Sequence, residues 1–141
     1  MNVIETLINH PIHPLIVHFP IALTTTGLFF IICAFIWQRK KVLEQIAFSN
    51  ISLAAISTVF AGITGYYDYV HQWQRTAPYH TTKIILASIL FAITANTALV
   101  RWRKPDLFEH SIARWVYAGA YLVSFGIAAV LGYIGGIIVY G

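Results

Sequence analysis

The chain has 141 residues, of which 58% are hydrophobic and only 10% are charged, and its mean hydropathy is +0.71. Soluble domains carry about 25% charged residues, so this composition excludes an ordinary water-soluble globule. The formal net charge of +4 does not indicate nucleic-acid binding, because the basic residues form short clusters beside apolar runs. The single cysteine, Cys33, excludes a disulfide framework and a Cys-x-x-Cys-His haem attachment.

Four apolar stretches follow one another along the chain, and none of them contains a lysine, arginine, aspartate or glutamate: 15–37, 46–67, 84–100 and 115–140. A helix needs roughly 20 apolar residues, and about 17 at the least, to cross the hydrocarbon core of a bilayer. We therefore predict an all-α membrane protein, a four-transmembrane-helix bundle that forms a single domain over residues 1–141 in the lipid bilayer. The predicted helices cover about residues 14–37, 46–69, 80–101 and 112–140.

Basic residues gather on one side of the predicted membrane. Seven lie in or beside the connections that follow the first and third helices: Arg39, Lys40, Lys41, Arg101, Arg103, Lys104 and Arg114. Only Arg75 and Lys83 lie on the other side. Because cytoplasmic loops carry the excess of lysine and arginine, we expect both termini to be non-cytoplasmic.

The segment His10–Leu23 places three histidines and three prolines at the entry of the first apolar run. Proline is favoured in the first turn of a helix, so we expect Pro14 to be the first helical residue and His13 to be the cap. A histidine at membrane depth is costly unless something binds it. The segment therefore predicts a site at this end of the bundle.

Histidines concentrate on the predicted non-cytoplasmic side, together with Asp68. They are His10, His13, His18, His71 and His80. For any single one of them, a structural or solvated role is the simpler interpretation. His18 and His80 differ, because each lies at the start of an apolar helix, where an imidazole without a partner is costly.

Two neutral imidazoles on separate helices of a bundle suit haem b, whose iron takes axial ligands from both faces. In this hypothesis His18 and His80 are the axial ligands, and Arg75 or Lys83 pairs with the propionates. His13 is then a ligand of a second centre or a hydrogen-bonding neighbour. His13 and His18 lie about 140° apart around a helix, so we do not expect them to bind one iron together.

A copper or zinc ion is the alternative cofactor. Its candidate ligands form a nitrogen-rich set with one carboxylate: His13, His18, His71, His80 and Asp68. A third hypothesis is an accessory subunit that binds only other membrane proteins. No Ser-His-Asp order, Gly-x-Ser-x-Gly elbow or His-Glu-x-x-His helix occurs, so an electron carrier is expected rather than a stand-alone enzyme.

The segment His10–Leu23 resembles the signature of a bacterial four-helix membrane family catalogued as domain of unknown function 2231. The segments Gly62–Asp68 and Gly132–Gly141 are also similar to that family, and His80 falls where it carries a histidine opening the third helix. The resemblance covers nearly the whole chain and implies a bacterial four-helix membrane protein. Together with the charge bias, which places the basic side in the cytoplasm, we expect an inner-membrane protein with its histidine cluster on the periplasmic side. Relatives joined to cytochrome c-like or Rieske-like modules imply redox work with cytochrome c or another redox partner. A homo-oligomer is a further expectation.

Overall fold

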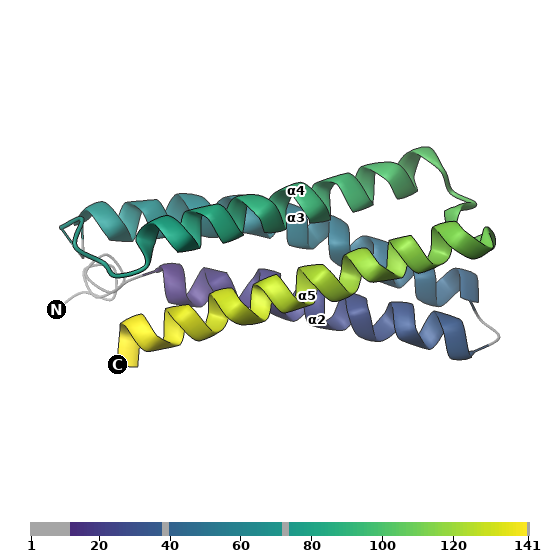
Figure 1. Ribbon diagram of the computed structural model, residues 1–141, viewed down its shortest axis with the longest axis horizontal. Coiled ribbons are helices and arrows are strands. Elements are labelled where there is room, and N and C mark those ends of the chain that lie inside the picture. The colour runs from purple at the N-terminus through teal and green to yellow at the C-terminus, as the bar shows by residue number, and fades with distance from the viewer. Residues whose placement is uncertain (1–11, 38–39, 72–73, 141) are drawn as a thin grey trace, which may run out of the picture.

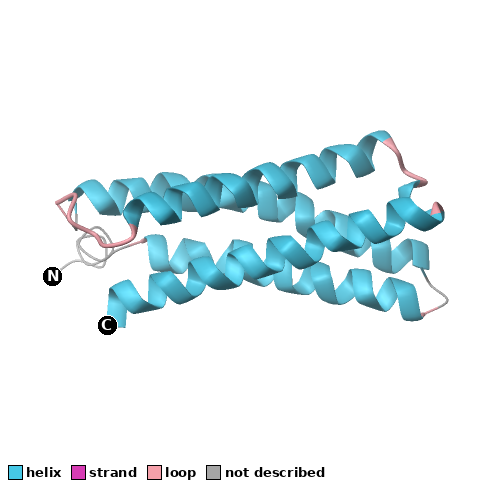
Figure 2. Cartoon of the chain, viewed as in Figure 1, coloured by secondary structure: helices cyan, strands magenta, loops and turns pink. Residues whose placement is uncertain are grey.

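The computed structural model describes residues 12–37, 40–71 and 74–140. Within these residues the chain forms four long helices and one short 3-10 helix, with no strand (Figures 1 and 2). The elements are α2 (His13–Ile36), α3 (Lys40–His71), α4 (His80–Arg103), η1 (Leu107–Glu109) and α5 (Ser111–Tyr140). The long helices lie side by side along one axis (Figure 1).

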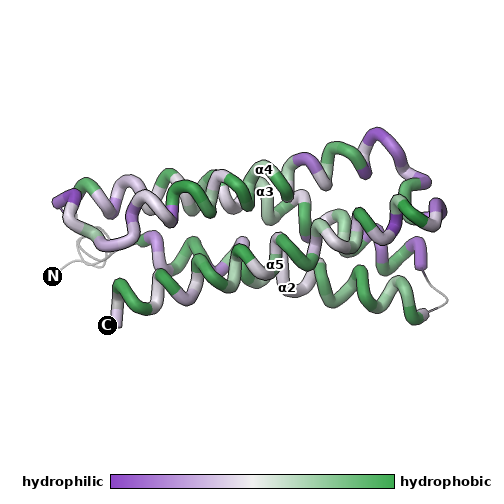
Figure 3. The backbone as a smooth tube through the Cα atoms, in the orientation of Figure 1, coloured by the Kyte–Doolittle hydropathy of each residue, from purple (hydrophilic) through white to green (hydrophobic). Residues whose placement is uncertain are grey.

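Each of the four long helices is long and apolar enough to cross a membrane. The 24 residues of α2 span roughly 36 Å at 1.5 Å per residue, which exceeds the roughly 30 Å of the hydrocarbon core. Large apolar side chains are exposed on every helix, among them Leu15, Ile56, Ile85 and Val123. Figure 3 shows hydrophobic residues along the middle of the helices and hydrophilic residues near the ends of α3 and α4. The predicted four-helix membrane bundle is confirmed, and these exposed faces contact lipid.

The helices close into a ring of neighbours. Both α2 and α4 pack against α3 and α5, so α2 and α4 lie on the diagonal of the bundle. Because α2 and α4 run in the same direction, their first turns lie at the same end, together with the last turns of α3 and α5 (Figure 1). We call this the histidine end, after His13, His18, His71 and His80. The opposite, basic end carries Lys40, Lys41, Arg101, Arg103, Lys104 and Arg114.

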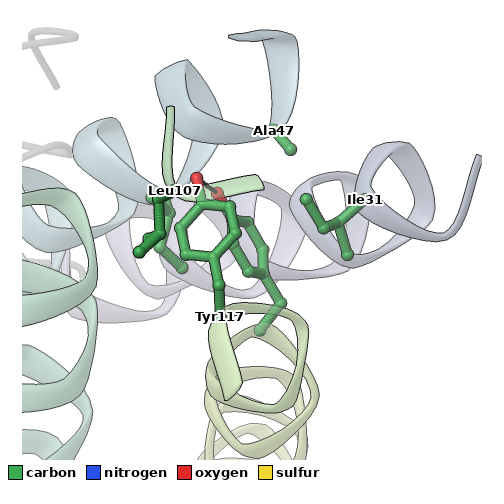
Figure 4. Packing of buried hydrophobic residues seen from close by; sticks show 6 residues of the cluster. Ile31, Ala47, Leu107 and Tyr117 are labelled. Atoms are coloured by element: carbon green, nitrogen blue, oxygen red, sulfur yellow. Dashed lines mark hydrogen bonds between the residues drawn. The ribbon is translucent and has the colours of Figure 1, made fainter. Parts of the chain in front are cut away.

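The buried core extends from the middle of the bundle to the basic end. Its larger cluster consists of Ile31, Ala47, Ile51, Leu107, Tyr117 and Tyr121 (Figure 4). A smaller cluster joins α4 to α5 through Leu90, Ala128 and Leu131. The first turns of α2, from His13 to Phe19, contribute no buried residue. The packing therefore leaves the histidine end more open than the rest of the molecule.

A buried ion pair joins three helices near the basic end. Nε and Nη2 of Arg101 on α4 donate hydrogen bonds of 2.5 and 2.7 Å to the two carboxylate oxygens of Glu44 on α3. The hydroxyl of Tyr117 on α5 donates to the same carboxylate at 3.1 Å and lies 2.8 Å from the hydroxyl of Tyr121 (Figure 4 shows the two tyrosines). Two-pronged pairs of this kind are directional, so this one holds three helices in register.

Three helix starts differ from the prediction, and at the last of them α5 begins at Ser111 and not at Ile112. α3 begins at Lys40 and not at Ile46. The prediction missed this polar first turn because it used apolar runs to place the helices. Lysine, glutamate and glutamine are nevertheless good helix formers. In α2, His13 is already helical and Ile12 is the N-cap, so the prediction of His13 as the cap is wrong by one residue. Pro14 does lie in the first turn, where its missing N–H costs nothing.

Candidate functional site: a cavity at the histidine end

A cavity of about 590 Å³ lies between the four long helices at the histidine end. Its volume falls in the range typical of small-molecule and cofactor sites. The lining is largely apolar, and its ionisable members other than tyrosine are His13, His18, Asp68, His80 and Lys83. The structure therefore brings together five of the seven site residues expected from the sequence.

Asp68 is buried, with 5% of its surface exposed, and it caps a helix other than its own. Its Oδ2 accepts a hydrogen bond of 3.0 Å from the backbone N–H of His13, the first residue of α2. The first N–H groups of a helix have no partner within that helix, and a carboxylate there also complements the helix dipole. Asp68 on α3 thereby fixes where α2 enters the bundle.

The His13 ring lies directly against the backbone of α3. A Cβ added to Gly65 would lie 2.9 Å from Cε1 of His13, closer than real side-chain contacts allow. Nδ1 of the same ring is 3.4 Å from the hydroxyl oxygen of Thr64. A Cβ at Gly62, by contrast, would meet nothing within 4 Å in the described part of the chain. Gly65 is therefore the residue that makes room for this imidazole.

His18 lies one turn further along α2 and is exposed. Its Nδ1 is hydrogen-bonded to the backbone carbonyl of Pro14. A carbonyl oxygen only accepts hydrogen bonds, so Nδ1 carries the proton in a neutral ring and Nε2 retains its lone pair. This is the tautomer that a metal centre binds through Nε2.

His80 is the first residue of α4, and its ring stacks on Tyr69 of α3. The ring centroids are 3.4 Å apart and the planes differ by 5°. The Tyr69 hydroxyl donates to the carbonyl of Arg75 at 2.9 Å, which ties the tyrosine to the connection that precedes α4. Within the described residues, neither ring nitrogen of His80 has a hydrogen-bond partner. Tyr69 thus orients His80 and leaves its nitrogens available.

Lys83 is the basic residue among those that line this cavity, apart from the histidines. It follows His80 by three residues and so lies on the same side of α4. Its side chain lines the same cavity as Asp68 and His13. An anionic group entering the cavity from the histidine end would meet this cation.

His71 and Arg75 are not among the lining residues of the cavity. His71 is exposed, stacks on Tyr67 at 4.2 Å between centroids and is hydrogen-bonded to the Tyr67 carbonyl at 3.0 Å. Arg75 is exposed and has a positive φ of 65°. His10 lies outside the described residues. In the described part of the chain, no group of three or more His, Cys, Asp or Glu side chains is arranged to hold a metal ion.

The end of α5 supplies space. Gly132, Gly135 and Gly136 line the cavity. A Cβ at Gly132 would lie 2.9 Å from Cδ1 of Ile21, so this glycine lets α5 approach α2 closely. A Cβ at Gly135 or Gly136 would meet no atom of the described residues within 4 Å. The last two glycines therefore leave part of the cavity wall without side chains.

Four membrane-spanning helices around an open, largely apolar cavity define the class of protein: a polytopic four-helix membrane protein. The model of the family described as predicted membrane protein (DUF2231) matches residues 9–141. The chain therefore belongs to this family, as the resemblance of its opening histidine segment indicated. Comparison with curated proteins and with solved structures gives no match.

Proposed function

We propose that this protein is a membrane b-type haem protein that transfers electrons near the histidine end, with His18 and His80 as the axial ligands. One observation carries the proposal: these two histidines lie on the diagonal helices α2 and α4 and line the same cavity. A haem in a helix bundle takes its axial ligands from opposite sides, and a diagonal pair suits this arrangement. When bound, the haem would supply a one-electron redox centre.

The state of both imidazoles supports this assignment. A ligating histidine commonly donates its other ring N–H to a carbonyl or carboxylate, and the Pro14 carbonyl serves His18 in this way. His80 is held flat by Tyr69, and its nitrogens are free of hydrogen bonds to described residues. Both side chains therefore have an available nitrogen before any ligand arrives.

Space and charge in the cavity also agree with a haem. The glycines at 135 and 136 leave room for a planar macrocycle beside α5. Lys83 is the cation that would pair with a propionate, and it is favoured over Arg75 because Arg75 lies outside the cavity lining. His13, held by Gly65 and Thr64, would be a hydrogen-bonding neighbour of the bound group.

A haem is preferred to a copper or zinc ion because it needs only two protein ligands. Zinc sites in proteins use three or four, and the described residues gather no such set. Under the positive-inside rule the basic end faces the cytoplasm. The histidine end would then lie on the periplasmic side of a bacterial inner membrane, where a cytochrome c or a similar redox protein would be the partner.

The absorption spectrum of the protein purified in detergent tests the proposal. We expect a Soret band that is lost in His18→Ala and in His80→Ala. His71→Ala is the matched control, because His71 lies at the same end but outside the cavity, and His110→Ala is a control at the basic end. A Soret band unchanged in both ligand variants would show the assignment to be wrong. A colourless protein with bound copper or zinc by elemental analysis would favour the metal hypothesis, and a protein with neither would favour an accessory subunit.

A further inference from the structure

A second cavity, of about 540 Å³, lies at the basic end, where the segment joining α4 to α5 meets the start of α3. Four cationic side chains line it: Lys40, Lys41, Arg101 and Arg114. Three acidic side chains also line it: Glu44, Asp106 and Glu109. Charge balance in this cavity depends on which of these groups are already paired.

The acidic groups of the cavity all have cationic or histidine partners. Glu44 pairs with Arg101 at 2.5 Å, Glu109 with Lys41 at 3.4 Å, and Asp106 with His110 at 3.1 Å. Among the described residues, Lys40 and Arg114 have no acidic partner. The lining therefore holds two cations, Lys40 and Arg114, without a carboxylate partner among the described residues, and with His110 neutral its four cations and three carboxylates leave a net charge of +1.

Arg114 indicates that an acceptor is missing. Its Nε is buried and has no hydrogen-bond partner among the residues that the structure describes, and its guanidinium lies 5.8 Å from the centroid of the Phe35 ring. A buried donor without an acceptor is costly, and an arginine donor is costlier than a neutral one. An anion in the cavity would supply the acceptor, and phosphate oxygens match the planar fork of arginine.

The depth of the cavity points to the source of that anion. Trp37, Trp102 and Trp115 are all exposed at the basic end, close in sequence to the ends of α2, α4 and α5. Exposed tryptophans concentrate at the level of the lipid headgroups. The two unpaired cations thus lie at the depth where phospholipid phosphates are abundant.

We propose that this cavity binds the phosphate of an anionic glycerophospholipid, with Arg114 and Lys40 as its direct contacts. Basic pockets between transmembrane helices are known sites for anionic headgroups. The proposal concerns the basic end alone and does not depend on whether a haem binds at the histidine end.

The test compares lipid binding to the wild-type protein and to a Lys40→Gln/Arg114→Gln variant. Both are purified in an uncharged detergent and titrated with phosphatidylglycerol, phosphatidylcholine or inorganic phosphate, and bound lipid is counted by native mass spectrometry. Each cation near the surface contributes about fivefold to anionic-lipid binding, so we expect the double variant to bind phosphatidylglycerol roughly 25-fold more weakly. The matched control, Arg103→Gln/Lys104→Gln, removes the same charge at the same end but outside the cavity lining. We expect this variant to bind phosphatidylglycerol almost as tightly as the wild type.

Three results would overturn the proposal. Equal weakening in the control variant would mean a diffuse electrostatic effect rather than a site. Equal binding of phosphatidylcholine would remove the preference for an anionic lipid, and equally tight binding of inorganic phosphate would mean a free-anion site. If the double variant does not fold, Lys40→Gln at an exposed position carries the test, with an expected loss of about fivefold.

Discussion

At the scale of single residues, the polar side chains of the histidine end support the helices as well as lining the cavity. Asp68 was expected from the sequence as a metal ligand, and it lines the cavity, but its hydrogen bond goes to the backbone of His13. Sequence cannot reveal such a cap, because the two residues are 55 positions apart and the bond needs both helices in place. The stack of Tyr69 on His80 escaped prediction for the same reason, since the tyrosine is equally typical of an interfacial belt.

The hydrogen bond by which Asp68 caps α2 should contribute to the stability of the folded protein. Replacing Asp68 by Ala removes the acceptor for the His13 N–H, and we expect a loss of about 1–2 kcal/mol in unfolding free energy, as for other helix caps. Asp68→Asn keeps an acceptor oxygen, so its unfolding free energy should fall by less than that of Asp68→Ala. Thermal unfolding of the purified protein in detergent measures both. If Asn were as damaging as Ala, the negative charge of Asp68 would matter more than its acceptor oxygen.

Two glycines of α3 provide a matched pair. Gly65→Ala would push a methyl group to 2.9 Å from the His13 ring, so we expect it to destabilise the protein by about 1–3 kcal/mol, the usual effect of overpacking. Gly62→Ala adds a methyl group in open space and removes a poor helix former, so it should be neutral or slightly stabilising. The difference between their midpoints of thermal unfolding is the measurement. Equal midpoints would contradict the close contact between His13 and Gly65.

At the scale of helices, hydropathy predicted the four spans well because lipid imposes a long apolar run on each of them. It could not predict the polar start of α3, where Glu44 is stabilised by a residue of another helix, Arg101. Among the described residues, an added Cβ at Gly132 of α5 would meet a neighbour, Ile21 of α2, whereas one at Gly119, Gly126, Gly135 or Gly136 would not. Which glycine makes contact depends on the rotation of the helix, which spacing alone does not specify.

The buried pair of Arg101 and Glu44 tests how the helices are joined. Arg101→Leu leaves the buried Glu44 carboxylate unpaired, and we expect a loss of about 3–5 kcal/mol in unfolding free energy. Replacing both residues by Leu should recover most of that loss, because no unpaired charge is left. Lys41→Gln is the control, since the Lys41–Glu109 pair is exposed and such pairs contribute at most about 1 kcal/mol. An Arg101→Leu variant that is no less stable to heat than the Lys41→Gln control would contradict this account.

At the scale of the whole molecule, packing is unevenly distributed along the bundle. The buried clusters occupy the middle and the basic end, whereas the histidine end encloses a cavity lined by all four helices. A bundle that only had to span a membrane would be more stable if side chains filled that space, because close packing is the main attraction between helices in lipid. Under the proposed function this open end is the haem site, and filling it should separate binding from folding.

Gly135 is the position at which to fill the cavity. Gly135→Leu places a side chain in open space on the cavity wall, so we expect the fold to survive and the Soret band to be reduced at least tenfold if a haem binds there. Gly119→Leu makes the same change on the same helix, also in open space but outside the cavity, and should leave the band intact. Size-exclusion chromatography with absorbance at the Soret and protein wavelengths reports both folding and haem content. An undiminished band in Gly135→Leu, or an equal loss in Gly119→Leu, would mean that any haem binds elsewhere. The cavity between α2 and α4 would then need another ligand to explain why this end of the bundle is left open.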